Sequence, residues 1–110
     1  MTNRNLELYK LKAELCKTFS DPKRLMIIGE LRGGEKAVGE LAQALGISQA
    51  VVSRQLAILR EKGVVTPRRE KTTVYYSLTD LKIGDACDII HDVLLHQIEK
   101  NREMSERLII

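Results

Sequence analysis

The stretch GISQAVVSRQLAILREKGVV, which spans Gly46–Val65, has the features of a helix with two different sides. Its apolar side chains recur at the three- and four-residue spacing that places them on one helical face: Val52, Leu56 and Leu59. Ser48 is a typical N-cap residue, and Gly63 predicts the end of the helix. Hydrogen-bonding side chains crowd the front of the same segment: Ser48, Gln49, Ser53, Arg54 and Gln55.

The residues on either side of this helix complete a recognisable unit. Upstream, AVGELAQALGIS predicts a short helix over Val38–Leu45 that Gly46 closes. Two helices joined by a tight glycine-containing turn form a helix-turn-helix, which we place at residues 38–62. Downstream, VVTPRR and TTVYYSL have strand composition and predict a two-stranded hairpin, or wing, over residues 64–78. Pro67 cannot donate a ladder hydrogen bond, so its strand should lie at an edge.

Longer amphipathic helices are expected at the two ends of the chain. Leucines at helical spacing predict a first helix over about Leu6–Thr18, and Asp21 followed by Pro22 predicts the start of a second, over about Pro22–Arg32. A last helix over about Leu81–Arg107 has an apolar stripe formed by Ile83, Cys87, Ile90, Leu94, Met104 and Leu108. Because this stripe is longer than a small domain can cover, we interpret residues 1–20 and 80–110 as dimerisation helices of a homodimer.

The length and composition limit the classes of protein to which this chain can belong. The 110 residues, of which 44% are hydrophobic and 30% charged, are typical of a single domain, so we treat residues 1–110 as one. No long apolar run is present and the N-terminal segment is amphipathic, which predicts a cytoplasmic protein without a membrane segment. The sequence has neither a glycine-rich phosphate loop nor an acid, base and nucleophile constellation, so we do not expect an enzyme.

Charge is distributed unevenly along the chain. Between Ser48 and Lys71 six basic residues face two acidic ones, whereas acidic residues outnumber basic ones from Asp80 onward. Helix, helix-turn-helix, wing and long final helix together predict a mainly α-helical winged helix-turn-helix, whose second helix enters the major groove of double-stranded DNA.

In such a complex, glutamine pairs with adenine, arginine pairs with guanine, and serine contacts bases or phosphates. The hydrogen-bonding side chains at the front of the predicted helix would contact the bases of the operator. Three basic wing residues would bind its phosphates: Arg68, Arg69 and Lys71. The alternative is an adaptor whose winged helix binds another protein instead of specific DNA.

The segments DPKRLMII, SQAVVSRQLAILREKGVV and VYYSLTD together resemble the ArsR family of bacterial and archaeal transcriptional regulators, from Phe19 to Asp80. The resemblance implies a homodimeric winged helix protein that represses its operator and is released when an inducer, often a metal ion, binds. Two positions depart from the family pattern. Lys71 stands at the wing tip, where glycine is common, and Gln55 stands where histidine is frequent.

The resemblance also suggests where a metal would bind. The cysteine-rich metal-binding motif of some metal-sensing members is absent, because Ala37 and Gly39 stand where its cysteines would lie. Other metal-sensing members use acidic and histidine residues on the last helix. Asp85, His96 and Glu99 fall on three of these four ligand positions, but Ile83 occupies the fourth. A zinc-like transition metal held between two subunits is therefore one hypothesis. An acidic stripe that faces water, with no cofactor, is the interpretation that we prefer.

The two cysteines allow a redox hypothesis. Cys16 and Cys87 lie on the expected dimerisation helices and, without an export signal, are expected to be reduced thiols. A thiol switch needs an accessible thiolate of low pKa, whereas Cys87 lies on the apolar stripe, where a free cysteine behaves as a small hydrophobic residue. Dithiol members of the resembled family carry one cysteine where this chain has Gly29. A repressor that is constitutive, or regulated in some other way, is the third interpretation.

Overall fold

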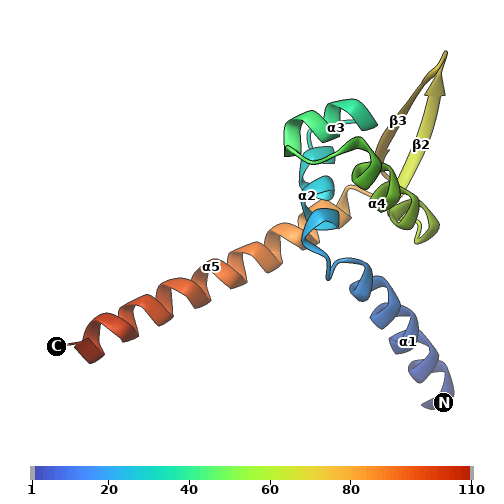
Figure 1. Ribbon diagram of the computed structural model, residues 1–110. Coiled ribbons are helices and arrows are strands. Elements are labelled where there is room, and N and C mark those ends of the chain that lie inside the picture. Colours follow the sequence, from blue (N-terminus) through green and yellow to red (C-terminus); the bar gives the residue numbers. More distant parts are fainter. Residues whose placement is uncertain (1, 110) are drawn as a thin grey trace.

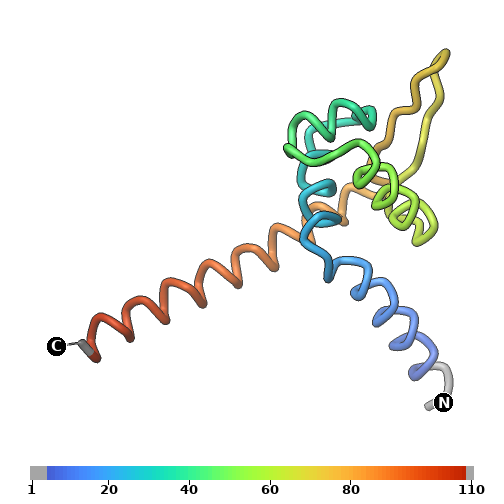
Figure 2. Tube along the Cα trace, in the orientation of Figure 1, coloured from blue at the N-terminus to red at the C-terminus, as the bar shows by residue number. Residues whose placement is uncertain are grey.

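A computed structural model describes the backbone of residues 2–109 and the side chains of residues 5–108. In chain order its elements are α1 (Thr2–Thr18), α2 (Pro22–Leu31), β1 (Lys36–Ala37), α3 (Val38–Leu45), α4 (Gln49–Glu61), β2 (Val65–Glu70), β3 (Thr73–Leu78) and α5 (Lys82–Ile109). Figure 1 shows α1 and α5 projecting in different directions from a body formed by the other elements. In the chain trace of Figure 2 both helices point away from the body, and the molecule is elongated, with extents of 62 × 47 × 21 Å.

The core lies between α2, α3, α4 and the base of the sheet. Three consecutive turns of α4 are anchored there, because Val52, Leu56 and Leu59 are all completely buried, as predicted. They pack with apolar side chains of the neighbouring elements: Ile27, Ile28, Leu31, Leu41, Val64, Val65 and Leu78. The opposite face of α4 is therefore left at the surface.

Local capping signals set the helix boundaries. The Asp21 carboxylate accepts hydrogen bonds from the backbone N–H groups of Lys23 and Arg24 at 2.8 and 3.2 Å, so it caps α2 as predicted. Gly46 ends α3 at a φ of 67°, a left-handed conformation that suits glycine. The sharp turn that follows places Ser48 at the start of α4, where its Oγ accepts from the Val51 N–H at 3.2 Å.

The sheet has one strand more than the hairpin that the sequence predicts. Its order is β1-β3-β2, all antiparallel, with Lys36 opposite Tyr76 and Arg68 opposite Tyr75. β1 is only two residues long, too short to show the alternation by which strands are recognised. β2 lies at an edge, in agreement with the position predicted from Pro67.

Arg32 attaches the start of α5 to the end of α2. Its Nη1 donates a hydrogen bond to the Gly84 carbonyl oxygen and lies 2.7 Å from the Asp88 carboxylate, while Nη2 lies 3.6 Å from Asp85. A Cβ atom at position 84 would lie 3.0 Å from the Arg32 side chain, so glycine permits this close approach. Beyond this attachment α5 continues away from the body, and no helix within residues 2–109 is long and apolar enough to cross a membrane.

Candidate nucleic-acid interface

The exposed face of α4 carries three of the predicted base-reading residues. Gln49, Ser53 and Arg54 are all exposed, while the buried residues Val52 and Leu56 hold the opposite side of the helix in the core. The side chains of Gln49, Ser53 and Arg54 are therefore left at the surface, with the Gln49 amide nitrogen next to Gly39 of α3. Ser48 lies beside them, but its hydroxyl oxygen already caps α4, which leaves mainly its proton for an outside acceptor.

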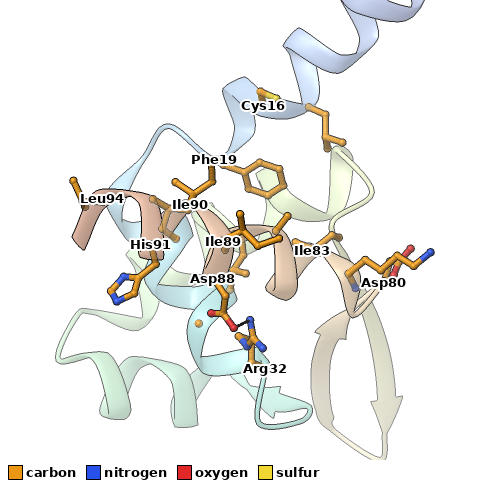
Figure 3. Close-up of a pocket in the computed structure, with 17 residues that line it drawn as sticks. Cys16, Phe19, Arg32, Asp80, Ile83, Asp88, Ile89, Ile90, His91 and Leu94 are labelled. Atoms are coloured by element: carbon orange, nitrogen blue, oxygen red, sulfur yellow. Dashed lines mark hydrogen bonds and ion pairs between the residues drawn. The ribbon is translucent and has the colours of Figure 1, made fainter. Parts of the chain in front are cut away.

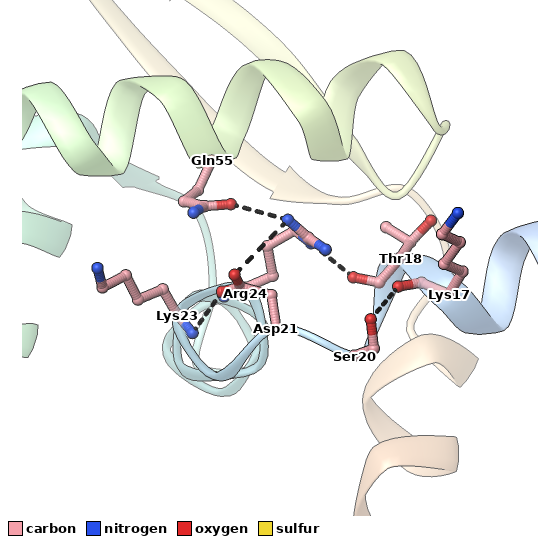
Figure 4. A network of polar contacts seen from close by, with 7 residues as sticks. All are labelled: Lys17, Thr18, Ser20, Asp21, Lys23, Arg24 and Gln55. Carbon is pink, nitrogen blue, oxygen red and sulfur yellow. Dashed lines mark hydrogen bonds and ion pairs between the residues drawn. The ribbon is translucent and has the colours of Figure 1, made fainter.

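Gln55 is placed differently from the other members of this predicted set. It is half-buried on the side of α4 that faces α2, and its Oε1 accepts a hydrogen bond from Arg24 Nη1 at 3.1 Å (Figure 4). A base contact through this oxygen would have to replace the Arg24 contact. The structure thus separates Gln55 from the exposed front of the helix.

The two arginines of the wing lie on opposite faces of the sheet. Side chains alternate along β2, so Arg69 shares a face with Val65, whose side chain is buried against the helical body. Arg68 shares the other face with Tyr75, its partner on β3, and its guanidinium lies 5.1 Å from that ring. Arg69 therefore lies on the side of the wing that faces the helices, and Arg68 on the side that faces away.

Arg68 is engaged with two carboxylates of the protein. Its Nε and Nη2 donate to Glu35 at 3.0 and 2.5 Å, and its Nη1 donates to Glu70 at 3.2 Å. The hydrogen bonds that Arg68 donates to Glu35, and then those to Glu70, raise the pKa of Arg68, and the same Arg68 contact holds the pKa of Glu35 below its usual value. Arg68, Arg69 and Lys71 are therefore not equivalent as phosphate contacts, because the positive charge of Arg68 is largely balanced by Glu35 and Glu70.

Lys71 occupies the tip of the wing. It is exposed and has a φ of 56°, which the family's usual glycine would adopt without strain. For a residue with a side chain this left-handed conformation costs about 1–2 kcal/mol. The turn nevertheless closes a regular β2–β3 ladder, and the Lys71 ammonium group projects at its end.

The predicted metal ligands are not brought together within one chain. Asp85 pairs with Arg32 at 3.6 Å, and Glu99 pairs with Arg102 at 2.9 Å. His96 lies on the same straight helix as Asp85, about 16 Å further along its axis. Within the part of the chain that the structure describes, no three histidine, cysteine, aspartate or glutamate residues form a group that could hold a metal ion. The residues present therefore do not fit a zinc site unless a second subunit supplies ligands.

Both cysteines line one cavity of about 900 Å³ between α1, α2 and α5 (Figure 3). Most of its other lining is apolar, including Phe19 and Leu94. Cys16 is exposed and Cys87 is half-buried. Burial raises the pKa of the Cys87 thiol, Asp88 adds to this effect and Arg32 opposes it. A thiol with a raised pKa is protonated at neutral pH and reacts slowly, so the redox role remains a hypothesis.

Comparisons with known proteins agree with this architecture. Residues 21–66 match the family described as bacterial regulatory protein, arsR family. The biofilm growth-associated repressor of Xylella fastidiosa is 41% identical over 85 residues, which cover 77% of this chain and 75% of the repressor.

Two solved structures are also similar. The crystal structure of Rv0081 from Mycobacterium tuberculosis matches with a TM-score of 0.77 and 35% identity, over 86% of this chain and 95% of that one. A homodimeric winged helix-turn-helix DNA-binding domain, Mb0332 from Mycobacterium bovis, matches with a TM-score of 0.76 and 29% identity, over 86% and 87% of the two chains.

Proposed function

Because this chain belongs to the arsR family of bacterial regulatory proteins, and is a DNA-binding transcriptional regulator rather than an enzyme, we propose that it represses transcription as an operator-bound homodimer. The observation that carries this proposal is the exposed front of α4 beside a basic wing. A helix held in the core by one face and exposing glutamine, serine and arginine on the other suits the major groove. Repression is supported by the similarity to the biofilm growth-associated repressor of Xylella fastidiosa.

A second copy of the chain accounts for the apolar surface of the terminal helices. α1 and α5 expose large apolar side chains, among them Leu11, Ile90 and Leu94, and the last two line the cavity between α1, α2 and α5. Contiguous apolar surface of this kind marks an interaction site in a protein that functions in water. The homodimeric Mb0332 domain supports the same arrangement here. Two recognition helices related by a two-fold axis would then read two half-sites of the operator. Because the bacterial chromosome lies in the cytoplasm, we place the protein there.

The direct test is a gel shift on the DNA upstream of the protein's own gene, with a scrambled duplex of equal length as control. We expect a tight complex with one upstream fragment and weak, salt-sensitive binding to the scrambled duplex. Absence of binding to any duplex at low salt would overturn the proposal in favour of a protein-binding adaptor. Repeating the assay with zinc, oxidant and polysulfide tests release by an inducer.

The wing provides a matched pair of arginines for testing phosphate contacts. We expect Arg69→Ala to weaken binding to all duplexes and to make the log–log salt dependence shallower by about two units, since each subunit of the homodimer loses one phosphate contact. Arg68→Ala should change the slope by less, because Glu35 and Glu70 already balance its charge. Fluorescence anisotropy across a salt series measures both slopes. A larger change for Arg68→Ala would mean that DNA displaces the carboxylates from this arginine.

A zinc titration tests the acidic side of α5. We expect the wild type and His96→Ala to bind zinc equally weakly, because Asp85 and Glu99 are already paired with arginines and Ile83 offers no ligand. Competition with a chromophoric chelator gives both affinities. A tight wild-type site that His96→Ala removes would instead establish a metal site shared between two subunits.

A further inference from the structure

Arg24 connects three helices at the point where α1 ends and α2 begins (Figure 4). Its Nε donates to the carbonyl oxygen of Thr18 at 2.6 Å, and its Nη1 donates to Oε1 of Gln55 at 3.1 Å. Its Nη1 also lies 4.0 Å from the Asp21 carboxylate that caps α2. Thr18 is the last residue of α1, and Gln55 lies in the middle of α4. One guanidinium group therefore contacts both a terminal helix and the recognition helix.

The chemistry of this contact favours arginine over any other side chain. The last carbonyl groups of a helix have no partner within it, and a cation is stabilised at that end by the helix dipole. A guanidinium group presents several N–H donors in a fixed planar fork, so it can hold two acceptors at a set angle, whereas a lysine ammonium cannot. The Arg24 side chain is only 15% exposed, which limits screening of these hydrogen bonds by water.

We propose that Arg24 is a positioning residue for operator recognition, acting through Gln55 to fix α4 against the end of α1. The proposal rests on the function proposed above, since it takes α4 as the recognition helix. Gln55 then orients the exposed front of α4 from inside the protein and does not read a base. A movement of α1 at the dimer interface is transmitted to α4 by two hydrogen bonds, one to Thr18 and one to Gln55, which the rigid guanidinium group of Arg24 donates.

A direct contact between Arg24 and a DNA phosphate is the main competing explanation, and it predicts different behaviour. Loss of a phosphate contact weakens specific and random duplexes alike and reduces the salt slope by about one unit for each subunit of the dimer. Loss of a positioning contact lowers the ratio of operator to random affinity and leaves the slope unchanged. Arg24→Lys keeps the positive charge but removes the planar guanidinium group, so it tests loss of the positioning contact without loss of charge.

The experiment measures operator and scrambled-duplex affinity, across a salt series, for Arg24→Lys, Gln55→Leu and the double variant. We expect each single variant to lower the specificity ratio about tenfold for each half-site, and hence about a hundredfold on a two-fold operator, since each subunit loses one hydrogen bond to a charged group. The double variant should lose no more than either single one, because both changes remove the same contact. Lys23→Met, which removes an exposed charge from the adjacent position, should leave the ratio unchanged.

Additive losses, an unchanged ratio or a reduced slope for Arg24→Lys would each overturn the proposal. Thermal unfolding of each variant shows whether it is folded, and Gln55→Leu tests the contact even if Arg24→Lys is unstable. Hydrogen exchange provides a second measurement, since operator binding should slow exchange in the last turn of α1 in the wild type and not in Arg24→Lys. If the wild type fails to discriminate between the duplexes, the proposed function itself has failed, which is a distinct result.

Discussion

Ile90→Glu is expected to separate the homodimer and to abolish tight operator binding. Ile90 is 68% exposed in the single chain, lines the cavity between α1, α2 and α5, and lies close to Leu94 and Phe19 (Figure 3). In the single chain a glutamate there would face water and leave the core intact. In the dimer the same carboxylate would be buried against apolar side chains without a partner, which costs several kcal/mol.

The loss of DNA binding follows from the loss of the second recognition helix. Two linked binding units gain about 10²–10⁴-fold in affinity over one, provided that both reach their half-sites together. Sedimentation velocity at micromolar concentration gives the oligomeric state, and anisotropy on the operator gives the affinity. His96→Glu places the same charge on the acidic side of α5 and should remain dimeric. A dimeric Ile90→Glu variant with wild-type affinity would show that the apolar faces of α1 and α5 do not form the interface.

Features that depend on neighbouring residues in the sequence could be predicted well. The start of α2 was predicted because Asp21 and Pro22 act on backbone groups within one turn, and Gly46 and Ser48 define the α3–α4 turn in the same local way. The burial of Leu56 follows from periodicity alone. Each of these signals is complete within a few residues, so no knowledge of the tertiary structure is needed to interpret it.

Contacts between distant segments could not be predicted from those signals. Glu35 and Arg68 lie 33 positions apart, and Arg24 and Gln55 lie 31 apart. Each member of these pairs resembles any polar surface residue in the sequence, because its partner is set by how the wing or α4 packs on the body. The sequence-based roles of Arg68 and Gln55 therefore rest only on the position of each residue within its own strand or helix. The structure adds the carboxylates and the guanidinium group that engage them.

Replacing Gln49 or Arg54 is expected to remove sequence discrimination while sparing random DNA. Both side chains are exposed on α4, and Arg54 has no carboxylate partner among the residues whose side chains the structure describes, unlike Arg68. A base contact of this kind contributes about 1–3 kcal/mol of discrimination at each half-site. Because a homodimer carries each substitution twice, we expect the loss on a two-fold operator to be about double that amount.

Arg54→Ala requires a control for charge, since an arginine at the front of a recognition helix can also bind a phosphate. Arg60→Ala removes the same charge from the exposed last turn of α4, away from the helix front, and should affect operator and scrambled duplexes equally. The measurement is anisotropy with both duplexes across a salt series. An unchanged specificity ratio for Gln49→Ala would contradict its base-reading role. If Arg54→Ala weakens both duplexes equally and reduces the salt slope by about two units, one for each subunit, Arg54 positions the helix on the phosphate backbone and leaves base reading to its neighbours.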